Sequence, residues 1–120
     1  MAISKNEAQS RIQINKMLEL SGWDLDIDSE KRNVEVEYPT PSGREVDYVL
    51  LDKNGFPLCV LEAKNFEIDP LIAKEQARDY AKELSCRFII LSNGREHYFW
   101  DIETGNPNTI GEFPQQRNLE

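Results

Sequence analysis

Two runs of β-forming residues joined by a short turn constrain this sequence more than any other feature. Residues 45–52 (EVDYVLLD) and 57–64 (PLCVLEAK) flank residues 53–56 (KNGF), whose Asn-Gly step is typical of a tight turn. The run from Leu58 to Leu61 is apolar on both faces, which is typical of a strand in the middle of a sheet. The sequence therefore predicts a β-hairpin at the centre of the fold.

Two helices are expected beside this hairpin. Residues 4–20 form the first, because Ser4 and Glu7 have the spacing of a capping box and apolar residues recur along the segment. The second begins at Asp69, an N-cap residue followed by proline, and extends to about Leu84. The apolar stripe of the first helix is expected to comprise Ile12, Met17 and Leu20, with Ala8 and Ile14 near them.

Three further segments have the residue pattern of strands. Residues 33–38 alternate between polar and apolar, and residues 87–92 and 95–101 are rich in β-formers. Residues 106–120 are interpreted as loop or tail. The sequence thus predicts an α/β (α+β) fold in a single domain, 1–120. We expect a mixed central sheet of about four to five strands flanked by helices, in the order α-(β)-β-β-α-β-β.

Charge and composition limit the classes of function. The 22 acidic and 14 basic residues give a net charge of −8, which argues against a protein that grips nucleic acid unaided. No apolar run is long enough for a membrane span or a signal peptide, so no membrane partner is expected. Cys59, Cys86 and His97 lack the spacing of a zinc site, and reduced thiols indicate a cytoplasmic location.

Three side chains on the hairpin form a candidate catalytic group. Glu62 and Lys64 are two residues apart on one strand, so their side chains share a face. A four-residue loop would place Asp52 opposite Pro57. Counting back along both strands then puts Asp47 opposite Glu62, with Cβ atoms roughly 4.5–5.5 Å apart.

This arrangement suits metal-assisted hydrolysis of a phosphodiester. Two opposed carboxylates repel each other, and together they offer the oxygen ligands that Mg²⁺ prefers. A bound metal lowers the pKa of a water molecule and offsets phosphate charge, and Lys64 is placed to orient that water or to stabilise negative charge. The alternative is a strand that ends in solvated charges. The acid at position 47 in matching register favours the functional interpretation.

Four motifs in the chain resemble the N-terminal nuclease domain of type I restriction enzyme R (endonuclease and motor) subunits, members of the PD-(D/E)xK superfamily. They are VDYVLLD (46–52), LEAK (61–64), QARDYA (76–81) and LSNG (91–94), and Glu7 and Gly22-Trp23 extend the match into the first helix. Val46 stands where the superfamily name has proline, a residue that supplies no ligand. The resemblance implies a restriction-endonuclease-like core and a chain that is a fragment of a larger R subunit.

The resemblance also assigns roles to residues. Asp47 and Glu62 would be metal ligands, together with the backbone carbonyl of Ala63, and Lys64 would be the catalytic lysine. Glu7 would be an additional acid at the metal, and the alternative is its role in the capping box.

Gln76 and Tyr80 are four residues apart and share a helix face. By the same resemblance they contact DNA or brace Lys64 and the metal-bound carboxylates. The alternative is that Tyr80 belongs to the core and Gln76 caps a strand end.

A basic line formed by Lys74, Arg78 and Lys82 follows the second helix. With Arg44 and Arg87, these side chains are candidates for phosphate contacts. The alternative is a solvated helix face whose basic residues pair with acidic neighbours.

The resemblance implies a Mg²⁺-dependent endodeoxyribonuclease, with Mn²⁺ as a substitute, in a type I restriction-modification system. Its substrate would be double-stranded DNA, and its partners would be the methylation and specificity subunits and a motor domain of the same full-length chain. ATP would be used only by that motor, since this sequence has no phosphate-binding P-loop motif. Two alternatives are a non-catalytic docking module with the same fold and a stand-alone repair or resolvase-type nuclease.

Overall fold

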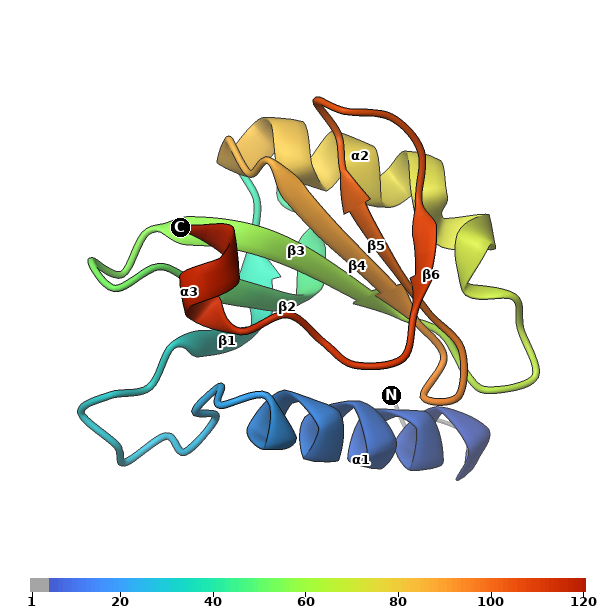
Figure 1. The fold of residues 1–120 in the computed structure, drawn as a ribbon, viewed down its shortest axis with the longest axis horizontal. Helices are drawn as coiled ribbons and strands as arrows, with labels where there is room; N and C mark the ends of the chain where they lie inside the picture. The colour runs from blue at the N-terminus through green and yellow to red at the C-terminus, as the bar shows by residue number, and fades with distance from the viewer. Residues whose placement is uncertain (1–4) are drawn as a thin grey trace.

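A computed structural model describes residues 5–120, which form one six-stranded sheet with helices on both faces (Figure 1). The strands follow the order of the sequence, and every neighbouring pair is antiparallel except β3 and β4, which are parallel. The strands are β1 (Val34–Pro39), β2 (Glu45–Leu51), β3 (Pro57–Ala63), β4 (Phe88–Ser92), β5 (His97–Asp101) and β6 (Asn108–Ile110). The predicted mixed α/β architecture is confirmed, with one strand more than expected.

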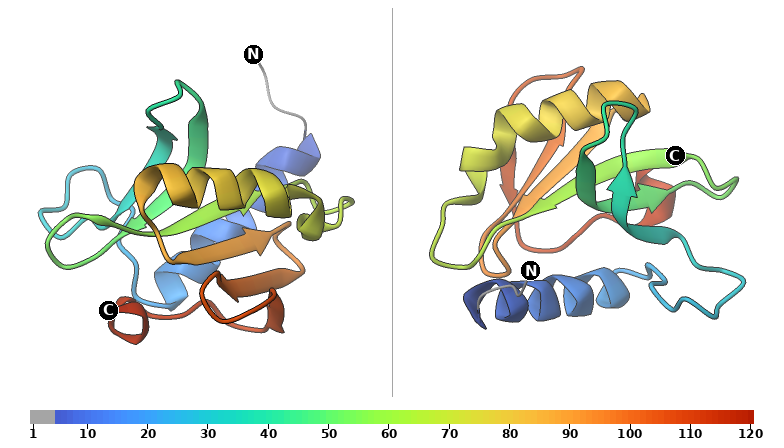
Figure 2. Two further views of the ribbon diagram at one scale, coloured as in Figure 1. Left: turned by 90° about the horizontal axis from the view of Figure 1, so that it is seen from above. Right: turned by 180° about the vertical axis from the view of Figure 1, so that it is seen from behind.

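Two layers of helix cover the sheet, with α1 (Lys5–Leu20) and α2 (Lys74–Leu84) on opposite faces (Figures 1 and 2). The alternation along β2 divides the core accordingly. Val49 packs in the cluster that contains residues of α2, whereas Tyr48 and Leu50 pack in the cluster that contains residues of α1. No helix in residues 5–120 is long and apolar enough to cross a membrane.

The β2–β3 hairpin has a β-bulge that the sequence did not predict. Tyr48 pairs with Leu61 and Leu50 pairs with Cys59, but the register then shifts, and Leu58 is the extra residue. We expected Asp52 to lie opposite Pro57, and this was wrong, because Leu51 is the residue that pairs with Pro57.

The turn of this hairpin explains the shift. The Asp52 carboxylate accepts the backbone N–H groups of Asn54 at 2.8 Å and Phe56 at 3.0 Å, and the Asp52 N–H donates to the Phe56 carbonyl at 2.8 Å. The turn therefore closes over five residues instead of four. The bulge restores the expected register farther along, next to positions 47 and 62.

The second predicted helix is divided into two parts. Residues Pro70–Ala73 form a 3₁₀ turn, η1, before α2 begins. Asp69 is the expected N-cap, since its carboxylate accepts the Leu71 N–H at 2.9 Å. Ser85, in the left-handed conformation, ends α2 and leads the chain into β4 beside β3.

The buried face of α1 differs from the predicted apolar stripe. Its buried residues are Ser10, Ile14 and Leu18, at the i, i+4 spacing of one helix face. Ile12 is 45% exposed and Leu20 is 87% exposed, although both were assigned to the stripe. A serine in the contact face concealed the true orientation. The predicted cap Ser4 lies outside the described residues.

The segment predicted as loop or tail, 106–120, contains regular structure. Strand β6 pairs with β5, and a short helix, α3 (Gln116–Leu119), follows it. Phe113 is buried against the α1 side of the sheet, and the Trp23 indole N–H donates to the Pro114 carbonyl at 2.8 Å. Contacts with distant residues, rather than local sequence pattern, therefore order residues 106–120.

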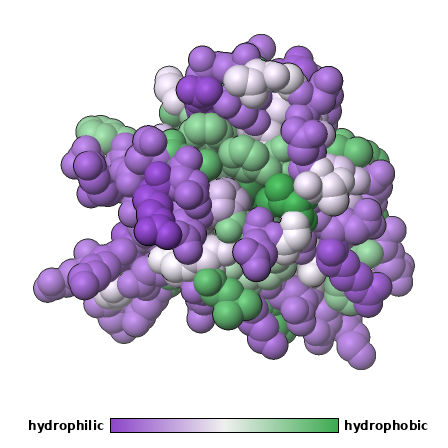
Figure 3. Space-filling view, viewed as in Figure 1, coloured by the Kyte–Doolittle hydropathy of each residue, from purple (hydrophilic) through white to green (hydrophobic). Residues whose placement is uncertain are grey.

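Figure 3 shows apolar side chains in the middle of one face of the molecule, with hydrophilic residues around them.

We expect Phe113→Ala to lower the free energy of unfolding by about 3 kcal/mol, because it empties a buried aromatic site. Phe113 is 3% exposed, whereas Phe56 at the hairpin turn is 67% exposed. Phe56→Ala is therefore the matched control, with a change below about 0.5 kcal/mol. Urea unfolding measures both. Equal losses of unfolding free energy in the two variants would show that the burial of Phe113 adds nothing to the stability of the core.

His97 gives the fold a pH-dependent contribution. It is buried in β5, its Nδ1 lies 2.7 Å from the Ser92 hydroxyl, and its ring meets Phe113 edge-on at 5.1 Å. Burial lowers the pKa of His97 below its ordinary value.

The unfolded chain therefore takes up a proton at His97 before the folded chain does. The stability that this residue contributes is present at pH 7 and is lost as pH falls below about 6.5. We expect the difference in unfolding free energy between wild type and His97→Gln to shrink from pH 7 to pH 5.5. Chemical denaturation at both pH values measures it, and a constant difference would contradict the assignment.

Candidate active site

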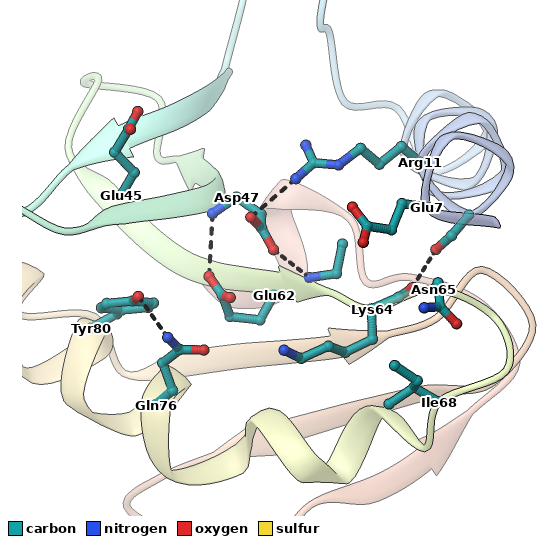
Figure 4. Close-up of a pocket in the computed structure, with 12 residues that line it drawn as sticks. Glu7, Arg11, Glu45, Asp47, Glu62, Lys64, Asn65, Ile68, Gln76 and Tyr80 are labelled. Carbon is teal, nitrogen blue, oxygen red and sulfur yellow. Dashed lines mark hydrogen bonds and ion pairs between the residues drawn. The ribbon is translucent and has the colours of Figure 1, made fainter. Parts of the chain in front are cut away.

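A cavity of about 340 Å³ opens at the end of β3, between α1 and α2 (Figure 4). It collects side chains from α1, β2, β3, the loop after β3 and α2. Seven residues singled out in the sequence line it: Glu7, Asp47, Glu62, Ala63, Lys64, Gln76 and Tyr80.

Asp47 and Glu62 are locked together across β2 and β3. The Asp47 N–H donates to Glu62 Oε1 at 3.2 Å, and the Ala63 N–H donates to Asp47 Oδ2 at 2.8 Å. These two bonds replace regular ladder bonds at the end of the paired region. Each carboxylate is therefore held by the backbone of the opposite strand, in the register that the hairpin predicts.

Burial has a large effect on the charge of Glu62. This residue is only 5% exposed. Burial, with the nearby Asp47 carboxylate as the second cause, raises the pKa of Glu62 to about 8, while Lys64 acts in the opposite direction. A buried carboxylate with so little compensation is a position where a bound cation would lower the free energy of the ionised form.

The main chain of Lys64 is fixed from both sides. Its N–H donates to the Ser92 carbonyl at 2.9 Å, and its carbonyl accepts the Ser10 hydroxyl at 2.6 Å. The lysine thus leaves β3 at a point tied to both β4 and α1, and its side chain lines the cavity with Glu62 (Figure 4).

The LSNG segment supports the loop that follows Lys64. Asn93 is buried, its amide donates to the Ile68 carbonyl at 2.9 Å, and its side-chain oxygen accepts two backbone N–H groups of the β4–β5 turn. Gly94 has a φ of 89°, and a Cβ there would lie 3.1 Å from the Ser10 backbone. The glycine of this motif therefore lets α1 approach the β4–β5 turn closely at Ser10.

Gln76 and Tyr80 meet on the cavity side of α2. The Gln76 amide donates to the Tyr80 hydroxyl at 3.0 Å, and the Arg44 guanidinium lies 4.9 Å from the centre of the Tyr80 ring. Burial, and then the charge of Glu62, raise the pKa of Tyr80, so its hydroxyl stays protonated. Tyr80 is also buried in the core, as the alternative for this residue expected, and it lines the cavity together with Gln76.

The basic line on α2 is not brought to the cavity. Lys74 and Arg78 both lie over the Trp100 ring, each 5.1 Å from its centre, and Lys82 is not among the cavity-lining residues. The two remaining arginines of the predicted set pair with acids: Arg44 with Glu83 at 3.0 Å, and Arg87 with Asp101 at 2.8 Å. Arg44, Arg78 and Arg87 thus form surface ion pairs, and none of the five basic residues is among those that line the cavity. Contact of Lys74, Arg78 and Lys82 with DNA stays a prediction.

Arg11 of α1 is a cavity residue that the sequence analysis missed. Its Nη2 lies 3.1 Å from Asp47 Oδ1, and its Nη1 lies 3.0 Å from Glu37 Oε1. Its spacing of four residues from Glu7 was a usable signal, because i and i+4 share a helix face. Burial lowers the pKa of Arg11, but Asp47, Tyr48 and Glu37 together raise it above the ordinary value. Other missed lining residues are Ser10, Glu45, Asn65 and Ile68.

The donor set fits a cation that needs few protein ligands. Within residues 5–120, no group of three or more His, Cys, Asp or Glu side chains is arranged to hold a metal ion. Asp47 and Glu62 nevertheless present two adjacent carboxylates, and Glu7 lines the same cavity. Mg²⁺ is commonly held by one or two carboxylates and keeps several waters. Two carboxylates are thus ligands of the kind that Mg²⁺ accepts, and the described residues that line the cavity include no His or Cys of the kind that zinc prefers.

The fold of this chain is also found in a solved structure. A structure described as a fragment of the HsdR subunit of a type I restriction enzyme from Vibrio vulnificus YJ016 matches with a TM-score of 0.81 and 26% sequence identity. The match covers 99% of this chain and 25% of that chain, so this chain spans about a quarter of its length.

The family follows from the sequence match. Residues 9–114 match the family model described as the type I restriction enzyme R protein N terminus (HSDR_N), and the chain belongs to this family. No curated protein sequence matches the chain.

Gly94→Ala should destabilise the protein more than Gly43→Ala. Both glycines have a positive φ, 89° and 86°, so alanine costs about 1–2 kcal/mol at either position. Only at Gly94 does the added Cβ also meet backbone, that of Ser10, whereas nothing lies within 4 Å at Gly43. Urea unfolding of the two variants separates the contributions. Equal losses would mean that α1 does not depend on close approach at Gly94.

Proposed function

We propose that this chain is a Mg²⁺-dependent endonuclease domain of the PD-(D/E)xK class, which hydrolyses phosphodiester bonds of double-stranded DNA in a type I restriction-modification system. One observation carries the proposal. The buried Glu62 carboxyl is interlocked with Asp47 beside Lys64 in a single cavity, in a chain of the R protein N-terminal family.

Each residue has a role in the proposed reaction. Asp47 and Glu62, with the Ala63 carbonyl, would hold the metal ion, which supplies positive charge at the phosphate and lowers the pKa of the attacking water. Lys64 lines the same cavity, so its ammonium is placed to orient that water and to stabilise charge that develops on the phosphate. Glu7 is an additional acid beside this group.

Gln76 and Tyr80 are assigned a supporting role. The hydrogen bond between them fixes the Tyr80 hydroxyl at the wall of the cavity, beside the buried carboxylates. In this position the pair braces Glu62 and Lys64 or contacts the DNA backbone.

The charge of the chain assigns DNA binding to other parts of the enzyme. A net charge of −8 opposes the phosphate backbone, and the cavity itself has acidic residues in excess. We therefore assign sequence recognition to a specificity subunit, and ATP-driven translocation to a motor domain of the full-length chain. A methylation subunit completes the proposed cytoplasmic complex.

Cleavage of plasmid DNA by the enzyme complex tests this proposal. We expect Asp47→Asn, Glu62→Gln and Lys64→Met each to lower the rate at least about 100-fold, because each removes a group that acts on the transition state. Chelation of Mg²⁺ should abolish cleavage, and Mn²⁺ should restore it.

Arg32→Met is the matched control, since it removes an ion pair with Glu35 outside the cavity. Its cleavage rate should equal that of wild type. Full activity in the three cavity variants would reject the proposed site and favour a docking role for the domain.

A further inference from the structure

Three carboxylates lie in a row across the first three strands of the sheet. The pairs Val36–Tyr48 and Tyr38–Val46 place Glu37 level with Asp47. The pair Tyr48–Leu61 likewise places Asp47 level with Glu62. We call Glu37, Asp47 and Glu62 the carboxylate row. Like charges on neighbouring strands repel, so the negative charges of this row need compensation from outside the sheet.

Arg11 supplies that compensation from α1. Its guanidinium contacts two of the three carboxylates, at 3.0 Å for Glu37 and 3.1 Å for Asp47, and it lies 5.9 Å from the centre of the Tyr48 ring. The Arg11 side chain is only 28% exposed. This is a partly buried ion pair with two acceptors, which is held more firmly than an exposed surface pair.

The conformation of Glu37 adds to this contact. Its φ of 49° lies in the left-handed region, a costly conformation for a residue other than glycine. Among the described residues, Ser85 is the other such case, and its role as the cap of α2 accounts for it. At Glu37 the strand departs from regular geometry at the residue whose carboxylate binds Arg11.

A metal ion bound at Asp47 would compete with Arg11 for the carboxylate oxygens of this residue. Arg11 donates to Asp47 Oδ1, while the other oxygen, Oδ2, accepts the Ala63 N–H. A divalent ion on Asp47 and Glu62 would stand within a few ångströms of the guanidinium. Two positive centres at that distance in a partly buried site repel strongly.

We propose that Arg11 is the positioning residue that occupies Asp47 as its counter-cation when no metal is bound, and that binding of a divalent cation displaces its guanidinium from this carboxylate. The proposal rests on the proposed metal site. It makes α1 a part of that site: the helix holds the carboxylate in place until the metal arrives, and it reduces the affinity for the metal.

Opposite changes in two measurements distinguish this role from a structural one. Arg11→Met should lower the melting temperature of the metal-free protein, because Asp47 and Glu37 lose their counter-cation. The same variant should bind Mn²⁺ at least about tenfold more tightly than wild type in an isothermal titration, because the competing charge is gone. Arg87→Met, which breaks an ion pair outside the cavity, should leave the Mn²⁺ affinity unchanged.

The wild-type protein provides a second measurement without any loss of folding. The side-chain N–H signals of Arg11 in ¹⁵N NMR, assigned with Arg11→Lys, should shift as Mg²⁺ saturates the site. Wild type that binds Mn²⁺ no more weakly than Arg11→Met, or Arg11 signals that ignore bound Mg²⁺, would overturn this inference alone. Absence of Mn²⁺ binding in both wild type and Arg11→Met would overturn the metal site as well.

Discussion

The register of β2 against β3 is the constraint on which the rest of the site depends. Side chains alternate across a strand, so a slip of one residue would move Asp47 to the face opposite Glu62. The five-residue turn held by Asp52 would produce such a slip, and the extra residue Leu58 reverses it before the strands reach the cavity. The bulge is a small local irregularity, and it is what allows the Ala63 N–H to donate the hydrogen bond that fixes the Asp47 carboxylate.

The sheet provides the acids, and the helices on its two faces complete the cavity. Helix α1 contributes Arg11 and the Ser10 hydroxyl that binds the Lys64 carbonyl, while α2 contributes the bonded pair Gln76 and Tyr80. Buried charge is costly unless it is paired. In this cavity the cost of burying a charge falls on Glu62, which has few compensating partners and a raised pKa. This is the electrostatic condition under which a cation binds well.

The chain belongs to the R protein N-terminal family. The chain spans about a quarter of the Vibrio vulnificus HsdR fragment, and its sequence has neither a phosphate-binding loop motif nor a basic excess. The cavity is built for local chemistry on a phosphodiester in the function proposed for it. Holding and moving the DNA would then be the task of other domains and subunits.

Local pattern in the sequence was enough to predict the hairpin, the Asp69 cap and the position of Asp47 beside Glu62 on the neighbouring strand. Strand alternation and turn chemistry act over a few residues, so these features can be predicted locally. It was not enough for the face of α1 that is buried, for Arg11 on Asp47, or for the order in residues 106–120. These depend on contacts between distant segments, 36 residues apart for Arg11 and Asp47 and 91 apart for Trp23 and Pro114. The sequence thus determined which chemical groups the sheet carries, and tertiary packing decided which cation faces them.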